Sequence, residues 1–198
     1  MTSQADIRKR IRKQRKHLTQ QQQLRAAHHV THNIKQLGLF LKHQRFACYL
    51  ATQGEINTQL LIDELWHHKK ECLLPILHCS KQNKLQFMPF NEETTLIHNR
   101  YGILEPKRQT SLICPLHSID ILFMPLVAFD TQGQRIGMGG GYYDRTLNFL
   151  LRRHAWKKPK LIGLAYEFQK TEHIPKQAWD ISLDLIITET TIYNPNKS

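Results

Sequence analysis

The sequence predicts a three-layer α/β/α fold with an open, mostly parallel central sheet, a Rossmann-like architecture. Short apolar runs typical of buried strands alternate with stretches of helical apolar periodicity. The most apolar stretch, residues 119–129, is typical of a central strand that is covered on both faces. A glycine-rich segment follows this strand and precedes a predicted helix, which is where ligands bind in open α/β sheets.

The predicted elements follow from changes in apolar spacing and from the turn residues between them. The first helix is amphipathic and basic, and the second ends at Gly38. In chain order we expect helices over about 5–18 and 20–37, a strand over 45–50, a helix over 58–69, a strand over 71–77, a hairpin around 85–90, a loop over 101–107, a strand over 119–129, a helix over about 142–153, and strands over 161–165 and 185–188. The first two strands and the helix between them form one βαβ unit. Because no repeat or low-complexity linker divides the chain, we expect one domain over residues 1–198.

The net charge of +12, from 28 Lys and Arg against 16 Asp and Glu, indicates an anionic partner without identifying it. Nucleic acid, a nucleotide and a polyanionic metabolite are all open on charge alone. The basic helix lacks interleaved aromatic residues, and the chain carries no zinc-finger, homeodomain or RNP signature, so we expect no nucleic-acid partner. No apolar run is long enough for a membrane span or a signal peptide, so we expect a cytoplasmic protein with no membrane partner.

The four cysteines give no sign of a metal site. Cys48, Cys72, Cys79 and Cys114 are widely spaced, with neither a CxxC pair nor the Cys/His spacing of zinc ligands. We expect four unpaired thiols, each buried or half-buried.

The sharpest chemical signal is the segment over residues 135–145, RIGMGGGYYDR. Its glycines permit positive values of the backbone dihedral φ and let backbone N–H groups approach a ligand. The N-terminus of the helix that follows favours an anion such as phosphate. The segment lacks the GK[ST] ending of a P-loop, and a tyrosine occupies the third glycine position of the dinucleotide fingerprint. A flexible turn is the alternative, but the flanking arginines favour a phosphate site.

Three acidic residues are candidates for roles at such a site. Asp144 follows the glycines after two tyrosines and could bind Mg²⁺, which uses one or two carboxylates together with substrate phosphates. Its alternative is a helix cap or an ion pair with Arg145. Asp184, at the start of a predicted strand, is a second candidate for the metal. Glu55, in the loop that leaves the first strand, is either a turn residue or an acceptor for the N–H groups of a heterocycle.

Arg8 and Arg12 lie one turn apart on the basic helix and could clamp the phosphates of a nucleotide. A basic helix can equally be a solvated face, or it can coat RNA. The sequence alone leaves these alternatives open.

Five segments together resemble bacterial 5-formyltetrahydrofolate cyclo-ligases: YLATQGEINTQLLIDELW, LLPIL, YGILEP, LVAFDTQGQRIGMGGGYYDRTL and DISLDLIITE. The resemblance covers roughly residues 5–190. It implies a three-layer α/β fold and the ATP- and Mg²⁺-dependent conversion of 5-formyltetrahydrofolate to 5,10-methenyltetrahydrofolate through an N5-iminium phosphate. Such chemistry depends on positioning and charge neutralisation, so no protein nucleophile is expected.

The resemblance also implies roles for particular residues. Arg8, where the family has lysine, and Arg12 match the early nucleotide contact. The positions that match the ATP loop are Arg135, Ile136, Gly137, Met138, Gly139, Gly140, Gly141, Tyr142 and Tyr143. The positions that match the folate contacts are Leu50, Glu55, Met138, Gly139, Gly140, Gly141 and Tyr142. Asp144 and Asp184 match the metal ligands, and Gly140 stands where some relatives have a lysine.

ATP and a polyglutamylated folate would together account for the basic charge, and we expect a monomer. Two other functions are compatible with the basic helix and the glycine segment. A nucleic-acid-binding module would use the basic helix, and its affinity would fall steeply with salt. A small-molecule kinase with another substrate would use the same glycine segment, and its ATP turnover would not depend on 5-formyltetrahydrofolate.

Overall fold

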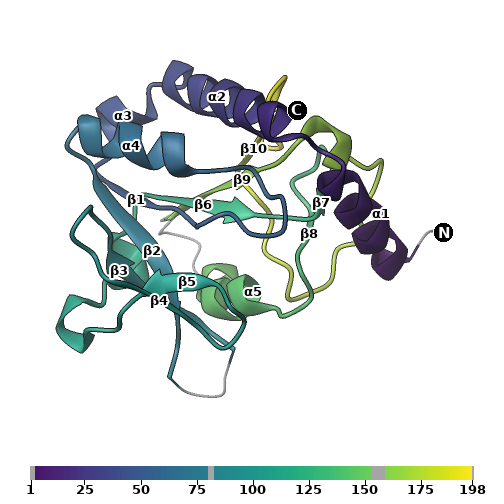
Figure 1. The fold of residues 1–198 in the computed structure, drawn as a ribbon. Helices are drawn as coiled ribbons and strands as arrows, with labels where there is room; N and C mark the ends of the chain where they lie inside the picture. The colour runs from purple at the N-terminus through teal and green to yellow at the C-terminus, as the bar shows by residue number, and fades with distance from the viewer. Residues whose placement is uncertain (1–2, 80–82, 153–158, 198) are drawn as a thin grey trace.

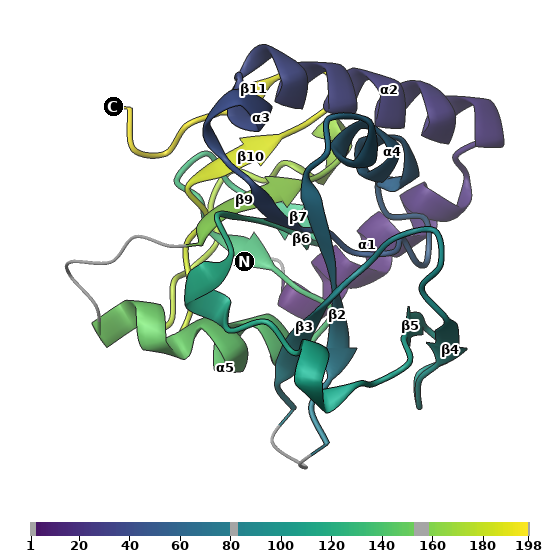
Figure 2. The same ribbon diagram turned by 90° about the vertical axis from the view of Figure 1, so that its left-hand side faces the viewer.

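The computed structural model describes residues 3–79, 83–152 and 159–197, and within them seven strands form one central sheet (Figure 1 and Figure 2). In spatial order the strands are β11 (Ile192–Tyr193), β10 (Leu185–Ile187), β9 (Lys160–Leu164), β6 (Ile121–Pro125), β1 (Arg45–Ala47), β2 (Glu71–Leu77) and β3 (Leu85–Pro89). All pairings from β10 to β2 are parallel, and the two outer strands pair in the antiparallel direction. The predicted open, mostly parallel sheet is confirmed.

Helices cover both faces of this sheet, which confirms the three predicted layers. The helices α2 (Gln20–Gln36), α3 (Leu39–Lys42) and α4 (Gln59–His67) lie on one face, and α5 (Tyr142–Leu147) lies on the other (Figure 1). Successive residues of β6 alternate between the two cores: Phe123 packs under α2 and α4, whereas Leu122 and Met124 pack toward α5. The strand is therefore buried on both sides, as its unbroken apolar run predicts.

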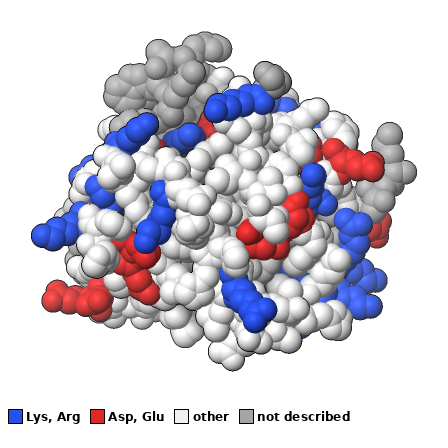
Figure 3. Space-filling view, turned by 90° about the horizontal axis from the view of Figure 1, so that it is seen from above, with Lys and Arg blue, Asp and Glu red and all other residues white. Residues whose placement is uncertain are grey.

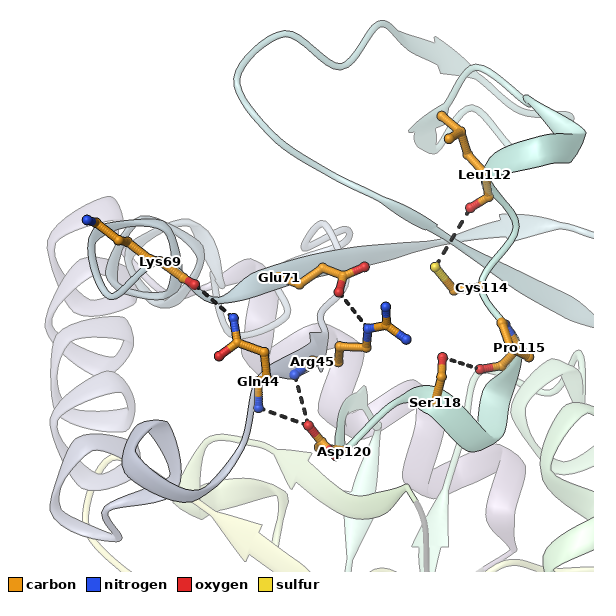
Figure 4. Close-up of polar contacts among 9 residues, drawn as sticks. All are labelled: Gln44, Arg45, Lys69, Glu71, Leu112, Cys114, Pro115, Ser118 and Asp120. Atoms are coloured by element: carbon orange, nitrogen blue, oxygen red, sulfur yellow. Dashed lines mark hydrogen bonds and ion pairs between the residues drawn. The ribbon is translucent and has the colours of Figure 1, made fainter.

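Polar contacts hold the strands together at the amino edge of the sheet (Figure 4). The carboxylate of Asp120 accepts the backbone amides of Gln44 at 2.9 Å and Arg45 at 3.0 Å, just before β6 and β1 begin. Arg45 forms an ion pair of 2.6 Å with Glu71 at the start of β2. The opposite edge, where the parallel strands end, is left for ligands.

The predicted strand over residues 119–129 is two strands in the structure. β6 ends at Pro125, and β7 (Ala128–Phe129) pairs with β8 (Arg135–Ile136) in a separate hairpin. The carbonyl of Leu126 between them accepts the side chains of Arg15 and Gln169, the latter at 2.9 Å. Because this carbonyl accepts hydrogen bonds from distant side chains, it does not pair with a neighbouring strand of the central sheet.

Three other predicted elements differ in the structure. The segment around 85–90 does not form a hairpin of its own, because β3 pairs with β2. The predicted loop over 101–107 contains β5 (Leu104–Pro106), which pairs with β4 (Leu96–His98). The helix predicted over about 142–153 is α5 followed by a 3₁₀ helix, η3 (Asn148–Arg152), and its last position lies outside the described residues.

The basic helix α1 (Gln4–Lys16) packs mainly on the β7–β8 hairpin. Its apolar side is narrow, with Ile7 and Ile11 buried against Val127, Ala128 and Ile136. The helix begins at Ser3, whose hydroxyl accepts the amide of Asp6 at 3.2 Å. Burial of two isoleucines therefore directs the arginines of α1 toward the segment that follows β8.

Cys48 and Cys72 are buried and Cys114 is half-buried, but Cys79 is exposed, contrary to expectation; all four are unpaired thiols. Among the described residues, no helix has the length and apolar character needed to cross a membrane.

We expect Asp130→Ala to lower the free energy of unfolding by about 3 kcal/mol. Asp130 is fully buried in the β7–β8 turn. Its carboxylate accepts the amides of Gln132 at 3.0 Å, Gln134 at 2.9 Å and Ile174 at 2.9 Å. Each buried donor left without a partner costs about 1–3 kcal/mol. Urea denaturation is the measurement, with the exposed neighbour Thr131→Ala as control; equal stability of the two variants contradicts the prediction.

Candidate active site

A cavity of about 460 Å³ lies at the carboxyl ends of β1, β2 and β6. Three segments line it: the loop after β1, with Leu50 and Glu55; the segment from Arg135 to Asp144; and the β4–β5 hairpin, with Tyr101 and Glu105. Its size is that of a small-molecule site, and its position is the one expected for an open α/β sheet. The structure thus brings two sequence-predicted groups together at one cavity.

The glycine segment has the backbone that its composition predicts, but only at two positions. Gly139 has φ of 100° and Gly141 has φ of 63°, values that strain residues with a side chain. Gly140 has no positive φ; a Cβ atom there would lie 3.0 Å from the ring of Tyr142. Gly137, Gly140, Gly141 and Met138 line the cavity.

The surroundings of this segment differ from the predicted strand-to-helix turn. It follows the short strand β8, which lies outside the central sheet, and precedes a helix of only 6 residues. A helix this short contributes little dipole, so backbone amides and nearby arginines must provide the attraction for an anion.

The N-terminal arginines meet the glycine segment. Arg8 Nε donates a hydrogen bond of 2.8 Å to the carbonyl of Gly137, 129 residues away in the sequence. Arg12 Nη2 lies 4.0 Å from the sulfur of Met138. The predicted nucleotide contacts of the basic helix and of the glycine segment are therefore adjacent in space.

Asp144 lines the cavity and forms an ion pair with Arg135, whereas the alternative to a metal role had named Arg145 or a helix cap. The Arg135 Nη2 to Asp144 Oδ1 distance is 2.7 Å, and the side chains are 6% and 30% exposed. Arg135 Nη1 also donates to the carbonyl of Ile181 at 2.5 Å. A buried arginine thus holds a partly exposed carboxylate at the edge of the cavity.

Asp184, the other predicted metal ligand, lies at the amino edge of the sheet, immediately before β10. Its carboxylate accepts the amide of Leu161 at 2.7 Å, and its own amide donates to the carbonyl of Leu161 at 2.9 Å. The described residues that line the cavity include Asp144 but not Asp184. Within the described part of the chain, no three His, Cys, Asp or Glu residues form a group that could hold a metal.

Glu55 is 6% exposed and lines the cavity, which favours a ligand contact over a surface turn. Its Oε2 accepts the amide of Thr52 at 3.0 Å and the hydroxyl of Thr52 at 3.3 Å. Burial raises the pKa of Glu55, and the Thr52 contacts and the charge of Arg15 oppose this rise. A carboxylate held by its own loop in this way is fixed in orientation.

The tip of the β4–β5 hairpin contacts the glycine segment across the cavity. Arg100 Nη2 donates to the hydroxyl of Tyr142 at 2.6 Å, and the hydroxyls of Tyr101 and Tyr142 are 2.8 Å apart. The Tyr101 and Tyr142 rings meet edge to face, with centroids 6.0 Å apart. The paired rings of Tyr101 and Tyr142 therefore bound the cavity where the hairpin meets the glycine segment.

Known proteins share both the sequence and the fold. The model of the 5-formyltetrahydrofolate cyclo-ligase family matches residues 1–189. The chain belongs to this family.

A 5-formyltetrahydrofolate cyclo-ligase of Haemophilus influenzae is 41% identical to this chain, and the match covers 91% of this chain and 95% of that enzyme. One of Escherichia coli is 36% identical, covering 92% and 98%. The solved structure of an Aquifex aeolicus 5,10-methenyltetrahydrofolate synthetase superimposes with a TM-score of 0.80 at 31% identity, covering 98% and 94%.

In this cyclo-ligase family member, sequence reasoning missed some residues of the cavity wall and one buried behind it. Tyr101 and Glu105 lie in the YGILEP segment, which marked the family but received no role. Arg15, only 2% exposed, is buried beside the Glu55 loop. The spacing of Arg8, Arg12 and Arg15 could have indicated it, since positions i, i+4 and i+7 share one side of a helix.

Proposed function

We propose that this protein converts 5-formyltetrahydrofolate to 5,10-methenyltetrahydrofolate with ATP and Mg²⁺, releasing ADP and phosphate. Family membership supports the reaction. The single observation that carries the assignment to this site is that Glu55 and the glycine segment line one cavity. A nucleotide on the glycines and a heterocycle at Glu55 would meet there with their reacting atoms close together.

In this proposal α1 and the glycine segment bind ATP. Arg8 and Arg12 neutralise phosphate charge, and Arg135 fixes the far side of the segment. The remaining nucleotide contacts are Ile136, Gly137, Met138, Gly139, Gly140, Gly141, Tyr142 and Tyr143. Leu50 and Glu55 bind the pterin, with the residues from Met138 to Tyr142 between the two ligands.

Mg²⁺ enters this site as part of the MgATP substrate. The residues present fit this role, since Asp144 offers one carboxylate beside the glycines and magnesium takes its other ligands from phosphates and water. The Asp144 carboxylate would then contact both the Arg135 guanidinium and the metal. The metal role of Asp184, whose carboxylate binds the Leu161 amide, stays a prediction.

The chemistry needs no protein nucleophile. The formyl oxygen on N5 attacks the γ-phosphorus, the bond to the leaving ADP breaks, and an N5-iminium phosphate forms. N10 then attacks the activated carbon, its proton leaves, and the C–O bond to phosphate breaks to give the methenyl bridge. The contribution of the protein is to position both ligands, exclude water and balance charge.

The test is near-ultraviolet absorbance of the methenyl product in mixtures of protein, ATP, Mg²⁺ and 5-formyltetrahydrofolate, each omitted in turn. We expect product only in the complete mixture, with one ADP per product. A folded protein that forms no product contradicts the proposal, and ATP turnover that ignores 5-formyltetrahydrofolate indicates the kinase alternative. Cytoplasmic location and the monomeric state stay predictions of the sequence.

The distribution of charge on one face gives no support to nucleic-acid binding. Over α2 and α4, acidic side chains interrupt the basic ones (Figure 3). Lys35 there forms an ion pair of 2.8 Å with Glu64. A mixed surface of this kind lacks the continuous basic stripe that follows a phosphate backbone.

We expect Glu55→Gln to weaken folate binding by roughly one to two orders of magnitude and to leave ATP binding nearly unchanged. The amide keeps an acceptor for Thr52 but faces the pterin donors with a donor of its own. A lost charge-assisted hydrogen bond in a partly dry pocket costs about 1.5–3 kcal/mol. Paired titrations of ATP and 5-formyltetrahydrofolate measure the effect.

Glu64→Gln, at a half-buried acid on α4 outside this cavity, is the matched control and should change neither affinity. Equal weakening of both ligands by Glu55→Gln would point to a structural role for the acid. Unchanged folate binding would remove Glu55 from the site.

A further inference from the structure

Arg15, in the last turn of α1, is an unusual buried cation. Its side chain is only 2% exposed. Its Nη2 donates to the carbonyl of Leu126, while Nε and Nη1 are buried with no hydrogen-bond partner among the described residues. An isolated charge in such a place is strongly disfavoured unless an opposite charge offsets it.

The loop that carries Glu55 packs directly on this turn of α1. A Cβ atom at Gly54 would lie 3.1 Å from the Cβ of Arg15 and 3.4 Å from its carbonyl oxygen. Only a glycine, here with φ of 72°, allows this approach. This contact places Glu55, the next residue, beside the last turn of α1, near enough for its charge to act on Arg15, although the two form no direct ion pair within the described residues.

Each charge offsets the burial of the other. Burial lowers the pKa of Arg15, and Glu55 is the foremost group that opposes this. Burial raises the pKa of Glu55, opposed by Thr52 and by Arg15. Tyr49 and Tyr166, which also face Arg15, stay neutral because burial raises their pKa values, that of Tyr166 to about 12. Thr52 holds the carboxylate by hydrogen bonds but brings no charge, and Arg12 is a like charge that opposes the ionisation of Arg15.

We propose that Arg15 is a positioning residue that keeps the carboxylate of Glu55 ionised for the pterin ring. The part that concerns pterin rests on the proposed function above. An ionised carboxylate accepts hydrogen bonds at both oxygens, whereas a protonated one must donate at one of them and would repel a second ligand N–H. Through Arg8, Arg12 and Arg15, a single helix would then serve both ligands.

The first test does not depend on folate. Carboxyl groups of ¹³C-labelled glutamates are titrated by NMR, and the resonance that Glu55→Gln removes is assigned to Glu55. Arg15→Met should move its titration midpoint to higher pH, because the offsetting charge is gone while an unbranched apolar side chain still fills part of the space. Arg15→Lys, which keeps the charge, and Lys16→Met, which removes an exposed neighbouring charge, should leave the midpoint near that of the wild type. An unchanged midpoint in folded Arg15→Met overturns the proposal.

The second test measures folate and ATP affinity between pH 5 and 8. Protonation of Glu55 at low pH removes a hydrogen-bond acceptor for folate. A variant in which Glu55 titrates at higher pH should therefore bind folate more weakly at acid pH but normally at alkaline pH. We expect Arg15→Met to weaken 5-formyltetrahydrofolate binding roughly tenfold at the acid end, with recovery toward pH 8, as for removal of one nearby opposite charge. ATP affinity should stay constant. Weakening of both ligands at every pH would indicate a merely structural role and overturn the proposal.

The two hypotheses can fail separately. Wild-type protein that binds no 5-formyltetrahydrofolate contradicts the proposed function, while the NMR titration still decides the role of Arg15. Arg15→Met should lower the stability of the protein, because it leaves Glu55 buried without an opposite charge. The double variant Arg15→Met/Glu55→Gln buries neither charge and should have a higher Tm than Arg15→Met. A double variant no more stable than Arg15→Met overturns the proposal.

Discussion

Gly139→Val should weaken ATP binding by about a hundredfold while leaving the protein folded. Gly139 has φ of 100°, which a β-branched residue strongly disfavours, so the segment must change its path. A Cβ atom there would meet nothing within 4 Å, so no packing is lost. Loss of one or two charge-assisted hydrogen bonds from backbone amides to phosphate, each about 1.5–3 kcal/mol, corresponds to this change in affinity. Calorimetric titration with ATP measures it.

Gly38→Val is the matched control for this variant. Gly38 has φ of 62°, and the nearest atom to a Cβ there would be Leu41 Cδ1 at 3.9 Å. It lies between α2 and α3, outside the cavity, so the same kind of strain should reduce stability without affecting ATP. If both variants keep wild-type ATP affinity, the glycine segment is only a turn and the nucleotide assignment fails.

Asp144→Asn should lower kcat by roughly 30- to 1,000-fold, or about 2–4 kcal/mol of transition-state stabilisation. The amide keeps the shape of the side chain and an acceptor for Arg135, so the 2.7 Å contact can persist without its charge. What is lost is the negative charge that would attract Mg²⁺ beside the γ-phosphate. Rates of methenyl formation over a Mg²⁺ titration should show a lower maximum and a higher metal requirement.

Two further variants make this result specific. Asp63→Asn removes an exposed carboxylate from α4, outside the cavity, and should behave as wild type. Asp184→Asn tests the second predicted ligand: a loss equal to that of Asp144→Asn supports a shared metal, and a small loss leaves Asp184 as a partner of the Leu161 amide. Near-normal turnover of Asp144→Asn with unchanged Mg²⁺ dependence would leave Asp144 as an ion-pair partner of Arg135.

Much of the fold could be predicted because its signals are local. The apolar runs of β1, β2, β6, β9 and β10 mark buried strands, and the periodicity of α2 and α4 marks helices. The short strands β4, β5, β8 and β11 were not predicted, since two or three residues show no alternation and, unlike β1 and β10, these strands carry no run of buried apolar residues. The end of β6 at Pro125 was not predicted either, because the side chains that donate hydrogen bonds to the carbonyl of Leu126 lie more than forty residues away in the sequence.

For the site, sequence determined the chemistry of the groups, and tertiary structure decided how they are used. Glycines in the segment after β8, an acid at position 144 and another at position 55 already indicate phosphate, metal and heterocycle contacts. Which glycines take positive φ depends on how the segment is held between β8 and α5. Whether Asp144 pairs with Arg135 or with Arg145 depends on the three-dimensional path of the chain.

The burial of a single charged residue could not be predicted from the sequence. Arg15 stands among basic residues that are exposed, and its spacing from Arg8 and Arg12 shows which side of the helix it lies on but not that it is buried there. Only the packing of α1 on the β7–β8 hairpin, and of Gly54 on its last turn, removes this arginine from water and leaves Glu55 to offset its charge. The energy of a charge depends on the solvent that the whole fold excludes, and this exclusion is a property of contacts distant in sequence.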